Sequence, residues 1–161
     1  MKTNSKRIIT LLTALVLLLS ACKANISRNA DGSFDVETIV GQQELQEAIT
    51  AAVADPLVRE ISVSLQSGYV LVAGVRERLN DPGKTDTLSF RLDLGVNNAQ
   101  LTASISDAQL DGVPMEQNRV DHWNQTIANR LAILGQKNPN STLKSISITT
   151  AAVTMIWTVT K

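Results

Sequence analysis

The chain has 161 residues, of which 43% are hydrophobic and only 3% aromatic, and its formal net charge is zero. Its single cysteine, Cys22, excludes an intrachain disulfide framework and a zinc site built from several cysteines. No block of basic residues occurs after the first few positions, which argues against a nucleic-acid partner, because binding to a phosphate backbone needs grouped Lys and Arg.

The first 21 residues have the three parts of a secretory signal. Lys2, Lys6 and Arg7 precede an apolar run over residues 8–19, and small residues follow it. The run is shorter than the ~20 residues that a membrane-spanning helix needs. We therefore expect residues 1–21 to be a signal peptide and the rest of the chain to be exported.

The end of this segment, Leu19-Ser20-Ala21-Cys22, resembles the lipobox of bacterial lipoproteins. The resemblance implies cleavage before Cys22, lipid attachment to its sulfur and acylation of the new amino group. Two or more acyl chains anchor a protein stably, whereas one chain binds only marginally. We expect an extracytoplasmic protein that is lipid-anchored to the bacterial cell membrane, or to an outer membrane where there is one. An ordinary signal peptide with a cysteine near its cleavage point is the alternative.

The mature chain would comprise residues 22–161. The signal segment holds three of the fifteen basic residues, so twelve remain against fifteen acidic ones, a formal charge of −3. Residues 22–35 are polar and rich in Asn, Asp, Gly and Ser, which predicts a lipidated N-terminus followed by a flexible tether. Residues 36–161 are long enough for a single domain with its own core.

The first part of this domain alternates between helical and strand patterns. Residues 40–55 predict a helix, because four apolar residues share one face and Asp55 precedes a proline. Residues 61–66 alternate as a strand, and Ser67-Gly68 predicts a hairpin turn. Residues 69–75 are apolar on both faces, which predicts the most deeply buried strand. Gly74 in this strand indicates a bend or bulge, or the close approach of a helix or a ligand.

The second part repeats the pattern. Residues 88–96 and 101–106 alternate as two further strands. A helix is expected from about Met115 to Leu134, followed by Gly135 at the C′ position, because apolar residues from Val120 onward step by 3, 4, 4 and 3. Residues 145–149 and 153–160 close the chain as two more strands.

These elements predict an α+β fold. We expect a curved antiparallel sheet of about six strands, in the order α-β-β-β-β-α-β-β, with two helices on its concave face. Nearly every strand carries hydroxyl side chains on its other face, which is typical of a sheet with one face in water.

Signals for catalysis are scarce. His122 is the only histidine, and its neighbour Asp121 points about 100° away on a helix, so it is poorly placed to orient the imidazole. No metal-ligand spacing, P-loop or dinucleotide glycine pattern occurs. We expect a solvated His122, no cofactor and a protein that is not an enzyme.

The element order resembles small extracytoplasmic proteins of the LmeA and YpmS kind, which are related to the tubular lipid-binding superfamily. The resemblance covers residues 36–161 and rests on the "GVNNAQLTASIS" turn, the "DGVPM" loop and the amphipathic helix after it. It implies a sheet curved around a long helix, with an apolar groove for lipid, although this chain is short for a complete lipid tube. A cystatin-like sheet around a helix is the rival architecture. The groove would be lined by apolar inner-face residues: Leu92, Leu94, Leu101, Trp123, Ile127, Leu131, Met155 and Trp157.

Two functions are therefore expected. The first is a non-catalytic module that binds a lipid or another apolar molecule in an aliphatic groove, since each buried methylene contributes about 0.8 kcal/mol. The second is a cell-envelope adaptor that binds another protein. Simple packing of Trp123 and Trp157 in a filled core is the alternative to a groove.

Overall fold

A computed structural model describes residues 25–81 and 83–160 and places nine strands and two helices within them. The elements are β1 (Asn25–Arg28), β2 (Phe34–Gly41), α2 (Gln42–Val53), β3 (Val58–Leu65), β4 (Val70–Glu77), β5 (Thr85–Asn97), β6 (Gln100–Leu110), β7 (Val113–Pro114), α3 (Gln117–Gly135), β8 (Ser141–Ile148) and β9 (Ala152–Val159).

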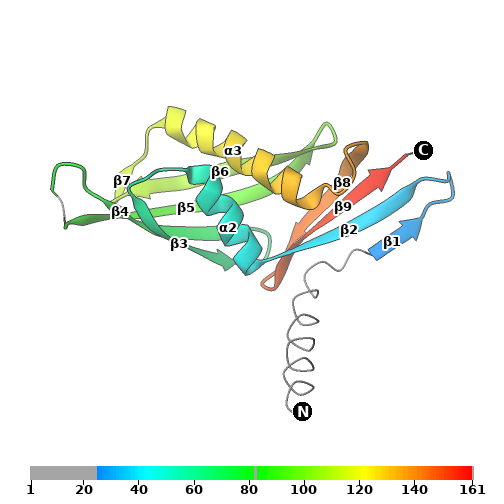
Figure 1. The fold of residues 1–161 in the computed structure, drawn as a ribbon, viewed down its shortest axis with the longest axis horizontal. Helices are drawn as coiled ribbons and strands as arrows, with labels where there is room; N and C mark the ends of the chain where they lie inside the picture. The colour runs from blue at the N-terminus through cyan, green and yellow to red at the C-terminus, as the bar shows by residue number, and fades with distance from the viewer. Residues whose placement is uncertain (1–24, 82, 161) are drawn as a thin grey trace, which may run out of the picture.

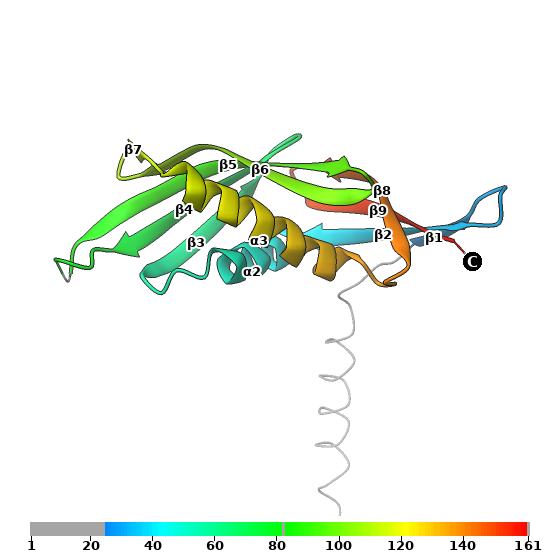
Figure 2. The same ribbon diagram turned by 90° about the horizontal axis from the view of Figure 1, so that it is seen from above.

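The predicted α+β class is confirmed, but the strands form two antiparallel sheets instead of one. Strands β3-β4-β5-β6-β7 make a five-stranded sheet, and β1-β2-β9-β8 make a four-stranded sheet. Figure 1 shows both helices lying over the five-stranded sheet, with the four-stranded sheet extending the molecule at one end. The view from above in Figure 2 shows α3 running along this sheet with α2 beside it.

Two backbone hydrogen bonds join the sheets. The amide of Leu143 in β8 donates to the carbonyl of Ala99 at the tip of the β5–β6 hairpin, at 3.0 Å. The amide of Gly68, in the β3–β4 turn, donates to the carbonyl of Ile148 at 3.0 Å. The edge of β8 therefore faces the ends of β4, β5 and β6, and the two sheets share one core.

Strands β3, β4, β5, β6, β8 and β9 lie where the sequence predicted strands. Strands β1, β2 and β7 were not predicted. Residues 25–28 pair with β2 where the sequence predicted a flexible tether, so the ordered part begins earlier than residue 36. Strand β2 was missed because Thr38 interrupts its apolar inner face. The buried hydroxyl of Thr38 donates to the carbonyl of Gly135 at 2.8 Å, so this polar residue closes the end of α3.

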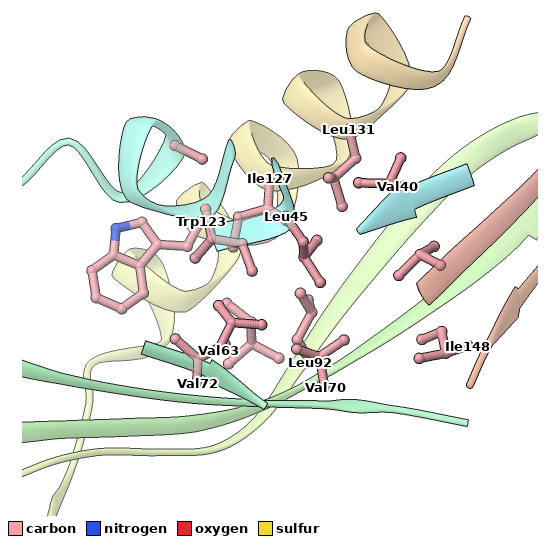
Figure 3. Packing of buried hydrophobic residues seen from close by; sticks show 14 of the residues in the cluster. Val40, Leu45, Val63, Val70, Val72, Leu92, Trp123, Ile127, Leu131 and Ile148 are labelled. Carbon is pink, nitrogen blue, oxygen red and sulfur yellow. The ribbon is translucent and has the colours of Figure 1, made fainter. Parts of the chain in front are cut away.

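Both helices bury the faces that their periodicity predicted. Leu45 and Ile49 of α2 are completely buried, as are Ile127 and Leu131 of α3. Figure 3 shows these helices above the sheet, with Leu45, Ile127 and Leu131 meeting strand side chains such as Leu92. Burial of this kind stabilises a fold by about 25 cal/mol for each Å² of apolar surface removed from water.

Gly74 permits a close approach, but of the neighbouring strand and not of a helix or a ligand. A Cβ atom at this position would lie 2.7 Å from the carbonyl oxygen of Glu60 in the paired strand β3. Strand β3 carries a register shift between Val58 and Glu60, next to Ile61, the residue that pairs with Gly74. The glycine therefore allows a bulge in the neighbouring strand to approach closely.

Strand β4 is buried on one face only, so the prediction of two buried faces was wrong. Val70 and Val72 point to the core, whereas Leu71 is 44% exposed and Ala73 is also exposed. The two helices cover a single face of this sheet, and no described element covers the other.

Candidate functional site

The eight residues predicted to line a lipid groove lie mainly in a filled core. Leu92, Ile127, Leu131 and Met155 are 0% exposed. Trp123 packs against Phe90 with ring centroids 5.8 Å apart, and Leu94 is half-buried at the margin of the same cluster. The structure thus brings these residues together, but it packs their side chains against one another instead of around an open groove.

Two of the eight, Leu101 and Trp157, also line a pocket of about 440 Å³ between the two sheets and α3. We call it the hairpin pocket, because the tip of the β5–β6 hairpin forms one wall. Its volume lies within the range of small-molecule sites. The lining residues are Asn98, Ala99, Gln100, Leu101, Ala128, Asn129, Ala132, Gln136, Pro139, Ser141, Thr142 and Trp157.

Local sequence explains why the pocket is open. Asn98 and Ala99 both have positive φ, at 49° and 60°, which forms the tight two-residue turn of the hairpin. Ala128 and Ala132 are four residues apart on α3, so they lie on one face of the helix and fill little space there. The loop after α3 is fixed by Gln136, whose Nε2 donates to the carbonyl of Ser141 at 3.0 Å.

The pocket combines an apolar surface with uncharged polar groups. Its surface is mainly polar, and the smaller apolar part comes from Leu101, three alanines, Pro139 and the indole of Trp157. No charged side chain lines it, and its polar side chains are amides and hydroxyls: Asn98, Gln100, Asn129, Gln136, Ser141 and Thr142. Such a surface suits a neutral molecule that has both an apolar part and hydrogen-bonding oxygens.

Trp157, one of the lining residues, carries an indole N–H group that has no hydrogen-bond acceptor. Trp157 is 4% exposed, and its Nε1 is the one buried side-chain nitrogen or oxygen without a hydrogen-bond partner in the described part of the chain. An unsatisfied buried donor costs about 1–3 kcal/mol.

A second hollow lies on the bare outer face of the five-stranded sheet and has a volume of about 550 Å³. Leu71 and Ala73 of β4 lie among serines there, with Tyr69 at one side. The guanidinium of Arg91 stands 4.1 Å from the centre of the Tyr69 ring and bonds Asp93 at 2.6 Å. We call this surface the outer groove.

Groups suited to catalysis do not converge at either hollow. His122 is exposed on α3, and the carboxylate of Asp121 accepts a hydrogen bond from Gln117 at 2.8 Å. Within residues 25–81 and 83–160, no group of three or more His, Cys, Asp and Glu residues is placed to hold a metal ion.

The amides of the hairpin pocket were not found by sequence reasoning. The pair Asn97-Asn98 was interpreted only as a turn, and Gln136 lies 38 positions further along the chain. Periodicity assigns residues to faces of single elements, and it gives no distance between a hairpin tip and the loop after a helix.

Cys22 and the expected signal peptide lie outside the described residues. None of the helices in the described part has the length and apolar character needed to cross a membrane. Comparisons with protein-family models, with curated proteins and with solved structures found no match to this chain.

Proposed function

We propose that this chain is a lipid-anchored extracytoplasmic lipoprotein that binds a small neutral amphipathic molecule, such as part of a lipid, without catalysing a reaction. The anchor is Cys22, and the binding site is the hairpin pocket. The observation that carries the binding site is an uncharged pocket lined by amides and hydroxyls, with Leu101 and Trp157 among its lining residues.

The chemistry of the pocket favours this ligand class. Methylene groups would rest on Leu101, Ala128 and Ala132, and each one removed from water contributes about 0.8 kcal/mol. An ester, amide or hydroxyl oxygen would accept hydrogen bonds from the amide rim. A phosphate or carboxylate would find no cationic side chain in the lining.

The direct test is native mass spectrometry of the secreted Cys22→Ala form, which carries no attached lipid of its own. We expect an additional bound mass. In the same background, Ala132→Leu should remove it, because the larger side chain fills the pocket. Ile133→Leu is the matched control, because Ile133 is the next residue of α3 and is 75% exposed.

A second measurement addresses Trp157 itself. The two tryptophans give two indole resonances, and the Trp157→Phe and Trp123→Phe variants assign them. We expect the Trp157 resonance alone to shift when the bound molecule is extracted. A folded protein with no bound mass and an unchanged Trp157 resonance would contradict the proposal.

A cell-envelope adaptor is the second candidate, and the outer groove favours it. The apolar sequence of β4 is typical of a strand covered on both faces, yet Leu71 remains 44% exposed in an uncovered hollow. A photo-crosslinker at position 71 should capture one specific envelope protein if this candidate is correct. The same group at Leu79, which is 74% exposed outside the outer groove, is the control.

A further inference from the structure

The first residue that the structure describes, Asn25, lies three positions after Cys22. Asn25 pairs with Glu37 in the β1–β2 ladder, and its side-chain amide donates to the Glu37 carboxylate at 3.0 Å. The hairpin that follows is closed by side chains: Asn29 donates to Ser33 at 2.9 Å, and the Ser33 hydroxyl donates to Asp31 at 2.6 Å. Most of the polar residues expected to form a tether are therefore used in a strand and a turn.

Chain length then limits how far the domain can lie from its anchor. The three residues from Cys22 to Asn25 span about 10 Å at most, even when fully extended. We infer that the free edge of β1 is held against the surface of the membrane, where it contacts lipid headgroups. This inference rests on the lipid attachment at Cys22 that is part of the proposed function.

The position and chemistry of β1 fit such a surface. Among the described residues it is an outer strand of the four-stranded sheet, with β2 on one side only, so half of its backbone groups face away from that sheet (Figure 1). Free strand edges are usually protected, because they can pair with other chains. Ile26 is 70% exposed, and its apolar side chain and the cationic Arg28 both suit the boundary between headgroups and acyl chains.

The inference also restricts where a protein partner could bind. A membrane surface against β1 prevents another chain from adding a strand at that edge. Partners of the anchored protein would then use surfaces away from β1, such as the outer groove, which lies on the other sheet.

The test compares two single cysteine variants of the lipidated full chain in phosphatidylcholine vesicles. Ile26→Cys and Leu79→Cys have closely matched exposure, at 70% and 74% for the native side chains. Both are reacted with a membrane-impermeant maleimide. We expect Ile26→Cys to react several-fold more slowly than Leu79→Cys on vesicles, and at a similar rate in the secreted Cys22→Ala background.

A flexible insert of about 20 Gly and Ser residues between Lys23 and Ala24 provides the second arm. Its ends lie about 25 Å apart on average, which releases the domain from the surface. We expect the insert to restore the reactivity of Ile26→Cys on vesicles. Equal rates for both variants without the insert would overturn the inference, and so would protection that persists with it, since that would indicate a covering protein chain.

Vesicle flotation separates this inference from the proposed anchor. If the protein does not float with vesicles and Cys22 itself reacts with the maleimide, the lipid attachment fails. If the protein floats but Ile26→Cys reacts freely, the anchor stands and the contact of β1 with the membrane is wrong.

Discussion

Gly135, the last residue of α3, shows how a single missing side chain sets the distance between a helix and a sheet. A Cβ atom there would lie 2.7 Å from Met155 Sδ and 3.2 Å from Trp157 Cζ2. The sequence predicted this glycine just beyond the helix, at the C′ position. It lies inside the helix instead, because its role is close packing against β9.

The Gly135→Ala variant tests that role, because two effects of opposite sign compete. In a helix, alanine is favoured over glycine by about 1 kcal/mol. Crowding in a packed core costs about 1–3 kcal/mol, and the Trp157 ring cannot move away easily. We expect a lower free energy of unfolding in urea denaturation.

Gly41→Ala is the control, because no atom lies within 4 Å of a Cβ built at Gly41 and its φ is −74°. An increase in stability for Gly135→Ala would show that the contact relaxes at little cost.

Asp35 connects three strands of the four-stranded sheet. Its carboxylate accepts hydrogen bonds from Lys144 Nζ in β8 at 2.6 Å, from Asn29 at 2.9 Å and from Thr158 in β9 at 2.8 Å. These donors, Lys144 first, lower the pKa of Asp35 to about 2 from an ordinary 3.8. The unfolded chain therefore binds this proton more readily than the folded one.

Stability should depend on pH accordingly. The contribution of the ionised Asp35 is fully present above about pH 4 and is lost as the pH falls toward 2, through the pKa of the folded state. Asp35→Asn should be less stable than wild type at pH 6, and the difference should shrink between pH 4 and pH 2. Urea denaturation across this range measures it, and a pH-independent difference would contradict the assignment.

At the scale of single elements, β4 gives the sharpest contrast between pattern and structure. Leu71 and Val72 are neighbours, but Val72 is 2% exposed and Leu71 is 44% exposed. We expect Val72→Ala to lower the free energy of unfolding by about 1–3 kcal/mol, since it removes buried methyl groups. Leu71→Ala should cost less than about 1 kcal/mol, because surface substitutions usually have small effects.

Paired thermal or urea unfolding of the two variants checks this prediction. Equal and large losses would mean that both faces of β4 are covered in solution, for example by a second protein chain on the outer groove.

Helix α3 and strand β4 together show what could be predicted from the sequence. The stripe from Val120 to Leu131 identified the buried face of α3, because a helix repeats every 3.6 residues and the apolar positions follow that period. Apolar composition alone could not tell whether the second face of β4 is covered by this chain or left free. Strand β2 was not predicted, because a polar residue, Thr38, occupies a core position in it. The hydrogen-bond acceptor of Thr38, the carbonyl of Gly135, is 97 residues away in the sequence.

The candidate site was harder to predict than the fold for a related reason. The eight apolar residues were correctly grouped on inner faces, since alternation fixes the side of a strand. Whether such residues leave space depends on how side chains from different elements interlock, which periodicity does not contain. The pocket that does exist arises where Asn98, Gln136 and Trp157 meet from three separate segments.

At the scale of the whole molecule, lipid attachment and folding should be independent. The described core uses residues from Val40 to Trp157, and Cys22 lies outside the described residues. Residue 25 is the first with an assigned strand partner. Attachment at Cys22 would therefore determine where the protein resides without contributing to the packing of the two sheets.

The Cys22→Ala variant tests this separation. We expect the variant to appear in the soluble extracytoplasmic fraction, because the residue that follows the proposed signal segment can no longer be lipidated. Its far-ultraviolet circular dichroism and its unfolding temperature should equal those of the wild-type domain after enzymatic removal of the anchored residues. Membrane fractionation by flotation measures the first expectation, and thermal denaturation measures the second. A variant that still floats with membranes after its first 21 residues have been removed would show that another part of the chain provides the attachment. A variant that unfolds would show that the N-terminal segment belongs to the folded unit.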